Sequence, residues 1–97
     1  MNFKIHLTFS FLFSSFLFAE IKGTVMDQST DEPLQGVNIT GKKTGTATNE
    51  SGEFSIDVPH GTELEFSHIG YHSISQLAKN GMSVEMSPAV IKSGEII

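Results

Sequence analysis

The chain has 97 residues, a formal net charge of −5 at pH 7 and neither cysteine nor tryptophan. This length allows one small domain, and without cysteine no disulfide can stabilise a small core. Past residue 19 the basic residues are five lysines, since Lys4 is one of the six in the chain, against eleven acidic residues. A chain so acidic, with no basic stripe, is a poor candidate for nucleic-acid binding.

Residues 1–19 have the three parts of a secretion signal. Lys4 supplies the positive start, residues 7–18 are almost all apolar or small, and Ala19 suits the position before a cleavage point. The apolar run is about 12 residues, against the roughly 20 that a membrane-spanning helix needs. No cysteine is available for acylation. We therefore expect export, removal of residues 1–19 and a mature chain with no membrane span.

Apolar and polar residues alternate along most of the remaining chain, which is the pattern of half-buried β-strands. Residues 21–27 are expected to form the first strand, and a polar loop at 28–33 ends it. Residues 34–40 are expected to form the second strand, with Val37 and Ile39 facing inward.

A tight turn lies at the centre of this pattern. The short strand expected at 44–48, whose one apolar contact is Ala47, leads into the turn 49–52. There Gly52 can adopt the positive φ that other residues disfavour. Strand residues follow at once in 53–58. The inward-facing residues of this strand are Phe54, Ile56 and Val58.

Proline and glycine separate the elements of the second half, because proline cannot donate to a ladder and glycine favours turns and bends. The separating residues are Pro59, Gly61 and Gly70. Residues 62–67 are expected to form a strand with Leu64 and Phe66 inward. Further strands are expected at 71–77 and 82–86. No segment combines helical periodicity with start and stop signals. Seven strands at this spacing predict an all-β antiparallel sandwich.

The ordered motifs resemble the carboxypeptidase-regulatory-like domain, a small transthyretin-like β-sandwich. The central turn fits the family pattern D-x-x-G-x-F with Asn49 in place of aspartate, and the next stretch fits V-P-x-G-x-x-L-x-F-S-x-I-G-Y. Earlier segments are similar to G-x-V-x-D and E-P-L-P-G-V-x-V. The resemblance spans about 21–86 and implies a seven-stranded Greek-key sandwich over residues 20–88. The turn and core residues that it identifies are Gly52, Phe54, Pro59, Gly61, Phe66, Gly70 and Tyr71.

The strand pattern stops after Pro88, so residues 89–97 are interpreted as a linker or the start of a coupling segment. In TonB-dependent outer-membrane receptors of the SusC-like type, such a domain precedes an energy-coupling segment, a plug and a barrel. The end of this chain, Glu95, Ile96 and Ile97, resembles the start of that segment. The resemblance thus implies a non-catalytic periplasmic accessory domain on a truncated or fragmentary chain. Its implied protein partners are the receptor's plug and barrel and an energy-transducing protein.

The alternative is a free-standing secreted module that binds a glycan or another envelope protein through a sheet edge or loops. Sugar-binding surfaces of sandwiches usually present aromatic side chains, and Tyr71 is the only aromatic residue expected to be partly exposed. A third reading is the regulatory domain of a carboxypeptidase, but this sequence contains no zinc-bearing catalytic domain.

No constellation of residues indicates an enzyme or a cofactor. His68 and His72 are four residues apart, roughly 13 Å along an extended strand, which is too far to share a metal ion. They are interpreted, with His60, as solvent-facing residues. The polar residues around Gly52 lack the spacing of a calcium loop. No serine lies in a G-x-S-x-G turn. We therefore expect no catalytic residue, no metal site and no cofactor.

Overall fold

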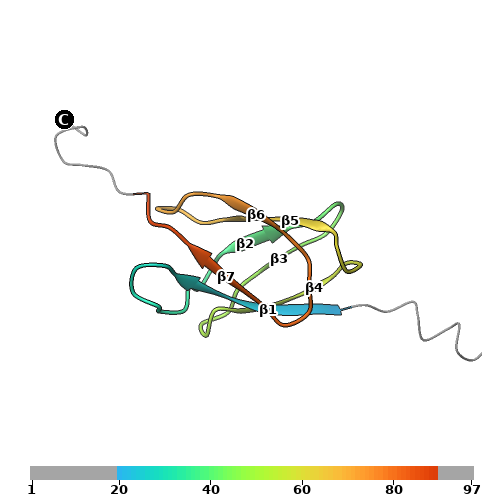
Figure 1. Cartoon of the computed structure of the whole chain (residues 1–97), viewed down its shortest axis with the longest axis horizontal. Coiled ribbons are helices and arrows are strands. Elements are labelled where there is room, and N and C mark those ends of the chain that lie inside the picture. The colour runs from blue at the N-terminus through green and yellow to red at the C-terminus, as the bar shows by residue number, and fades with distance from the viewer. Residues whose placement is uncertain (1–19, 90–97) are drawn as a thin grey trace, which may run out of the picture.

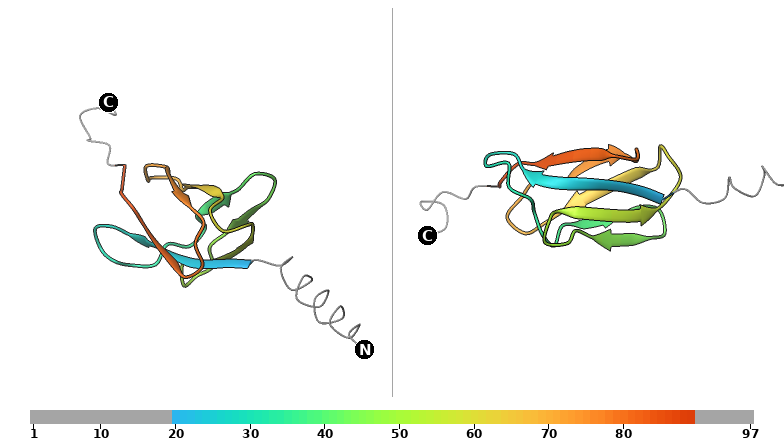
Figure 2. Two further views of the ribbon diagram at one scale, coloured as in Figure 1. Left: turned by 45° about the vertical axis from the view of Figure 1, so that its right-hand side comes forward. Right: turned by 90° about the horizontal axis from the view of Figure 1, so that it is seen from below.

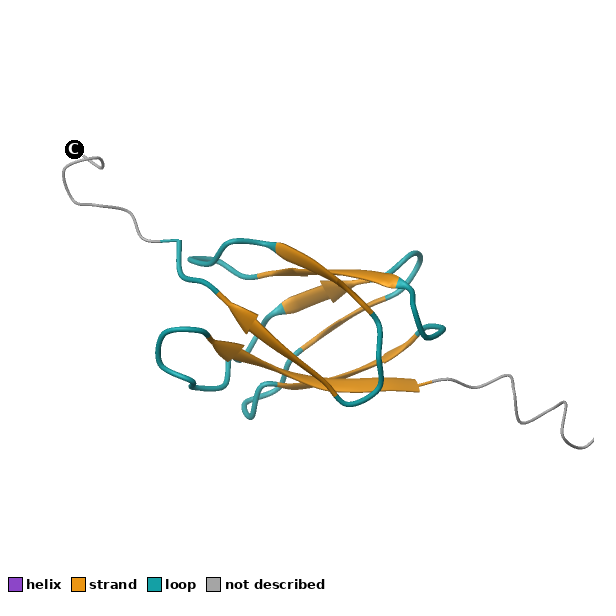
Figure 3. Ribbon diagram, in the orientation of Figure 1, coloured by secondary structure: helices purple, strands orange, loops and turns teal. Residues whose placement is uncertain are grey.

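The computed structural model describes residues 20–89 of the chain. These residues form seven strands and no helix, as Figure 3 shows. This part of the chain therefore holds no helix long and apolar enough to cross a membrane. The expected secretion signal, 1–19, and all but the first residue of the expected linker, 89–97, lie outside the described residues. The expected partner-binding residues outside them are Glu95, Ile96 and Ile97.

The strands pack as two sheets (Figure 1). In chain order they are β1 (Glu20–Asp27), β2 (Asn38–Thr40), β3 (Gly45–Ala47), β4 (Glu53–Asp57), β5 (Glu63–Ser67), β6 (Ile74–Leu77) and β7 (Met82–Met86). One sheet has the strand order β4-β1-β7 and the other has the order β3-β2-β5-β6. The structure confirms the predicted all-β fold of seven strands. The transthyretin-like Greek-key classification stays a prediction.

The prediction of a wholly antiparallel fold is wrong at one pair of strands. β1 and β7 run parallel, with Gly23 opposite Met82 and Asp27 opposite Met86, whereas the other ladders are antiparallel. After β6 the chain crosses from the second sheet to the first and lies beside β1 in the same direction (Figure 1). Side chains alternate with a period of two in parallel and antiparallel strands alike, so the alternation could not distinguish them.

The core lies between the two sheets and follows the predicted alternation in β4, β5 and β7. Phe54 and Phe66 meet edge to face there, with ring centroids 5.7 Å apart and ring planes at 72°. Such edge-to-face pairs are favourable beyond the apolar area that they bury. The buried apolar residues of the described part are Ile21, Val25, Val37, Ile39, Phe54, Ile56, Val58, Leu64, Phe66, Ala78, Met82, Val84 and Met86.

The second strand is shorter than the sequence predicted. β2 covers only the last three residues of the expected strand 34–40. Pro33 cannot donate to a ladder, and Gly36 has a φ of 81°, which turns the chain out of an extended path. Val37 and Ile39 are nevertheless fully buried, so their predicted inward orientation is confirmed.

The face of the third strand is opposite to the predicted one. Ala47 is exposed, whereas Thr46 is half-buried and Thr48 is buried. The buried hydroxyl of Thr48 is satisfied, because it accepts a hydrogen bond from the backbone N–H of Val37 at 2.9 Å and donates to the carbonyl of Leu34 at 2.6 Å. A strand made of threonine, glycine and one alanine has little apolar pattern to fix its face, and the hydrogen bonds of Thr48 decide it.

The expected strand 71–77 begins only at Ile74, because the residues before it pair with the end of the described chain. Tyr71 forms an isolated antiparallel bridge with Pro88, and the N–H of Ala89 donates to the carbonyl of Gly70 at 2.8 Å. Ala89, the first residue of the expected linker, is therefore still bonded to the sandwich.

Candidate functional site

The turn before β4 is held by the side chain of Asn49. Its Oδ1 accepts hydrogen bonds from the N–H groups of Ser51 and Glu53, both at 2.9 Å, and its backbone carbonyl accepts from Gly52 at 2.9 Å. The bonds to the backbone of the turn use the side-chain carbonyl oxygen, which a carboxylate oxygen of aspartate could also supply, whereas Nδ2 of Asn49 donates to Oε1 of Glu53 at 3.4 Å. This explains why asparagine can replace the aspartate of the resembling pattern.

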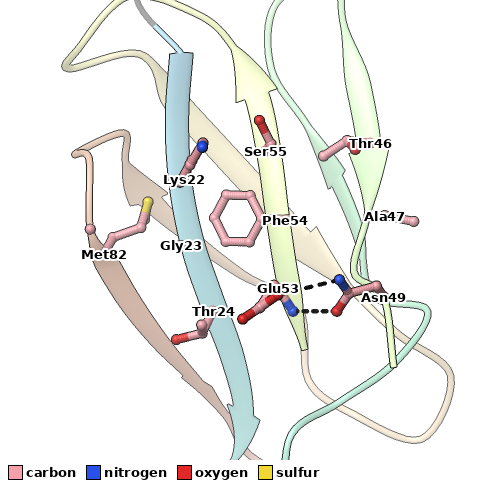
Figure 4. A pocket seen from close by; sticks show the side chains of 11 residues that line it. Lys22, Gly23, Thr24, Thr46, Ala47, Asn49, Glu53, Phe54, Ser55 and Met82 are labelled. Carbon is pink, nitrogen blue, oxygen red and sulfur yellow. Dashed lines mark hydrogen bonds between the residues drawn. The ribbon is translucent and has the colours of Figure 1, made fainter. Parts of the chain in front are cut away.

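An open groove of about 580 Å³ lies beside β4, and its lining residues come from β1, β3, β4, the turn before β4 and the start of β7 (Figure 4). Figure 2 (right) shows β4 between β1 and β3. Part of the lining is apolar, because Gly23 has no side chain and lets Phe54 and Met82 approach it. A Cβ on Gly23 would lie 2.8 Å from Cζ of Phe54 and 2.7 Å from Cγ of Met82. Polar lining residues are Lys22, Thr46, Asn49, Glu53 and Ser55.

The described part of the chain holds no cluster of reactive groups. Between residues 20 and 89, no three of the His, Asp and Glu side chains lie together as ligands for a metal ion. Ser55, the serine of the groove, donates its hydroxyl hydrogen bond to the carboxylate of Glu20.

A second polar feature links the end of β1 to the loop before β6. The hydroxyl of Tyr71 donates to Oδ2 of Asp27, and Oδ1 of Asp27 accepts from the N–H groups of Ser29 at 2.6 Å and Thr30 at 3.1 Å. The hydrogen bond from Tyr71, above all, holds the pKa of Asp27 below its ordinary value, although burial acts in the opposite direction. The same hydrogen bond is the main cause that raises the pKa of Tyr71, with burial and the charge of Asp27 adding to it.

We predict that Tyr71 titrates above the ordinary range of tyrosine and that Asp27→Asn brings the pKa back toward it. Because the chain has one tyrosine, ultraviolet absorbance of the tyrosinate reports on Tyr71 alone. Wild-type and variant curves that coincide would contradict this prediction.

The lowered pKa of Asp27 also fixes the direction of a pH effect. Ionised Asp27 contributes fully to the stability of the folded state above the ordinary carboxyl pKa. This contribution is lost as the pH falls through the lowered pKa that Asp27 has in the folded state. Tyr71→Phe removes the main cause of the shift, so the variant should be less stable at neutral pH and lose less stability in acid. Thermal melts of both proteins from neutral to acidic pH measure this, and parallel curves would contradict it.

Comparison with known proteins gives the family of this fold. Residues 21–97 match the model of the CarboxypepD_reg-like domain. The chain belongs to this family. The match runs to residue 97 and so includes the segment 89–97. Among curated proteins, none matches the chain closely enough to count as a relative.

Several solved structures share the fold of this CarboxypepD_reg-like domain. One of them is a chain in the crystal structure of a type II cohesin-X-dockerin complex, a C-terminal interface mutant, from Acetivibrio cellulolyticus. The superposition has a TM-score of 0.50 at 20% sequence identity and covers 71% of this chain and 51% of the other. This chain thus spans about half the length of that neighbour, and the likeness is one of fold.

The motif residues of this CarboxypepD_reg-like domain lie at turns and in the core, and the fold does not gather them into one site. Phe54 and Phe66 lie in the core, and Tyr71 binds Asp27. Pro59 is exposed after β4, where its carbonyl accepts from the N–H of Thr62 at 3.1 Å. The glycines with positive φ among them are Gly52 at 74°, Gly61 at 92° and Gly70 at 89°.

Sequence reasoning missed Asp27 as the partner of Tyr71. A signal for it was present, because Asp27 lies at an inward position of the first strand, where a carboxylate must be hydrogen-bonded. Asp27 is 8% exposed in the structure. The partner could not be identified, since Tyr71 is far away in the sequence and reaches Asp27 only through the packing of the two sheets.

The interpretation of His68 as a solvent-facing strand residue is wrong. His68 follows β5 and is half-buried, with its ring 5.3 Å from the ring of Tyr71 at 90°. Its Nε2 lies 3.0 Å from the carbonyl oxygen of Gln35, and its Nδ1 lies 2.8 Å from that of Ile69. β5 ends at Ser67, so His68 lies in the loop that bends at Gly70, and this loop packs beside Tyr71.

Proposed function

We propose that this CarboxypepD_reg-like domain is a non-catalytic periplasmic accessory domain of a TonB-dependent outer-membrane receptor of the SusC-like type. The observation that carries the proposal is membership of the family over residues 21–97, together with the resemblance of Glu95, Ile96 and Ile97 to the start of a coupling segment. Within residues 20–89 the side chains serve turns, core and sheet edges rather than a reaction centre.

The anchored exit of the chain supports this role. The segment Ser87–Ala89 is bonded to the loop that contains Gly70 and His72, by a hydrogen bond of 2.8 Å from Ala89 and one of 2.9 Å from His72. A connector that starts there begins at a defined point beside the sandwich. An apolar coupling segment further along would then be presented to an energy-transducing protein, which binds it by strand addition.

Reading the gene beyond the codon for Ile97 tests the proposal. A plug-and-barrel coding region, in frame or after a frameshift, is the expected result. A variant that ends at Ala89 provides the second measurement, because a connector should contribute little to the stability of the sandwich. If no such region follows and removal of residues 90–97 lowers the melting temperature, the tail belongs to the sandwich. The free-standing binding module is then the better account.

Export is part of the proposal and has its own test. The intact mass of the protein recovered from the periplasm should correspond to loss of residues 1–19, because a positive start, a short apolar run and a small residue occur in the order of a cleavable signal. Recovery of a protein with an intact N-terminus would contradict export by this route.

The proposed absence of catalysis and of a metal cofactor gives another prediction. A metal ion that binds the folded state raises the melting temperature by mass action. Because we propose that the domain has no metal site, zinc or calcium at micromolar concentration should leave its melting temperature unchanged. The chelator-treated protein is the control. An increase of several degrees with either metal would contradict the prediction.

A further inference from the structure

The free edge of β4 carries unpaired backbone groups. The N–H of Val25 on β1 donates to the carbonyl of Gly52 at 2.8 Å, so Val25 and Gly52 are a hydrogen-bonded pair of this ladder. The residues of β4 that bond to β1 can be counted from this pair. In an antiparallel pair the bonded residues alternate, so Phe54 and Ile56 bond to β1. The N–H and C=O groups of Ser55 and Asp57 therefore point away from β1. No strand of the described residues pairs with them on that side.

Asn49 already occupies the first outward position of this edge. Its N–H donates to the carbonyl of Glu53 at 2.9 Å, and its side-chain Oδ1 accepts from the N–H of Glu53 at 2.9 Å. These two bonds reproduce what one residue of a neighbouring strand would make. The edge thus has one occupied position at Glu53, followed by two open positions at Ser55 and Asp57.

The groove of about 580 Å³ lies beside this open edge (Figure 4). A strand added to β4 would place alternate side chains toward the sandwich, next to Phe54 of β4 and the half-buried Thr46 of β3, both of which line the groove. Apolar side chains suit these inward positions. The other side chains of the added strand would lie beside the outward residues of β4.

Charge decides which kind of strand fits. The outward side chains near the edge are Glu53 and Asp57 on β4 and Glu20 and Lys22 on β1, so three carboxylates face one ammonium group. A second copy of the chain is disfavoured, because antiparallel β4 strands centred on Ser55 would put Glu53 opposite Asp57, and like charges directly opposite are destabilising. Lysine or arginine at the outward positions of the added strand is favoured.

We propose that β4 binds an extended segment of a partner protein in which basic and apolar residues alternate, added as a fourth strand to the sheet β4-β1-β7. The backbone of the segment bonds to Ser55 and Asp57, its apolar side chains enter the groove and its basic side chains lie beside Glu53 and Asp57. This binding is independent of the receptor assignment, and it concerns a surface on the side of β4, not the tail 90–97.

The probe is a short synthetic peptide in which lysine and valine alternate, titrated into the isotope-labelled full chain. We expect a Kd tighter than about 1 mM, with chemical-shift changes and slowed hydrogen exchange at the amides of Ser55 and Asp57. One control peptide has every second backbone amide N-methylated, which keeps the charge and removes strand pairing. A second control has glutamate in place of lysine. Both controls should bind at least tenfold more weakly.

A matched pair of variants locates the site on the protein. Ser55→Pro removes an outward N–H that β1 does not use, and proline is tolerated at such edge positions. Ser83→Pro removes the equivalent outward N–H of β7. The carbonyl of Met86 accepts from the N–H of Gln28 at 2.9 Å, so by alternation Val84 also bonds to β1 and Ser83, three residues before Met86, does not. Ser55→Pro should weaken peptide binding at least tenfold, whereas Ser83→Pro should leave it unchanged.

Three outcomes would overturn the proposal. The first is no binding of the lysine-valine peptide up to millimolar concentration. The second is equal binding of the N-methylated peptide, which would show plain charge attraction and needs no variant to fold. The third is equal binding by both proline variants, each shown to be folded by its thermal melt. None of these results bears on the gene beyond Ile97, so failure here is distinct from failure of the receptor assignment.

Discussion

Phe66→Ala should lower the free energy of unfolding by about 3–5 kcal/mol, the usual loss for a phenylalanine truncated in a core. Phe66 is fully buried on β5, between Ile39 of β2 and Ile74 of β6, and its ring meets Phe54 of the other sheet. The ring thus joins the two layers. Since a single core in a domain of fewer than about 70–80 residues rarely supplies more than about 3–5 kcal/mol, the variant should be close to unfolded at room temperature.

Urea denaturation of Phe66→Ala against the wild type measures this loss. Phe54→Ala, at the other side of the same ring contact, should fall in the same range of about 3–5 kcal/mol. The matched control is Ile69→Ala, because Ile69 is 94% exposed and its truncation should change stability by less than about 0.5 kcal/mol. If Phe66→Ala is no more destabilising than Ile69→Ala, the core has been assigned wrongly.

Gly52→Ala should be the most destabilising of the glycine substitutions at positive φ. Gly52 has a φ of 74°, and an added Cβ would lie 2.6 Å from the carbonyl oxygen of Val25 and 2.9 Å from Cβ of Pro33. That carbonyl also accepts the N–H of Leu34 at 3.0 Å, so its displacement would disturb a second contact. Backbone strain of about 1 kcal/mol and overpacking of about 1–3 kcal/mol together give a loss of about 2–4 kcal/mol.

Gly81→Ala separates the two causes. Gly81 has a φ of 84°, and nothing lies within 4 Å of the position its Cβ would take. This control should therefore show only the backbone strain, about 1 kcal/mol. The difference between the two variants in chemical denaturation measures the collision at Gly52. Equal losses would mean that the turn is not packed against β1 as described.

Most strands and their inward faces could be predicted from the sequence, because the alternation of apolar and polar residues depends only on the pleat of a strand. The three apolar residues of 53–58 and the pair in 62–67 were placed on the correct face, since large apolar residues strictly alternate with polar ones there. The same argument failed at Ala47, where no large side chain marks the face and the hydroxyl of Thr48 has the stronger preference. Proline and glycine located the turns, but they could not show that the loop around Gly70 pairs with residues 87–89.

The candidate site could be predicted only in part. The turn at Gly52 follows from local backbone chemistry, and the structure gives Gly52 its positive φ. The groove does not follow, because it arises where the edges of two different sheets meet and where Gly23 leaves room for Phe54 and Met82. The parallel pairing of β1 with β7 and the edge position of β4 are likewise properties of the whole topology rather than of any one segment.

The proposal that this domain serves a larger receptor is tested most directly by finding which polypeptide carries it in the outer membrane. Outer-membrane proteins of the source cells are separated by size under denaturing conditions, and each fraction is digested and sequenced by mass spectrometry. We expect peptides from residues 20–89 in an integral membrane polypeptide large enough to include a plug and a barrel. Their recovery only in a small soluble protein of the periplasm would contradict the proposed function.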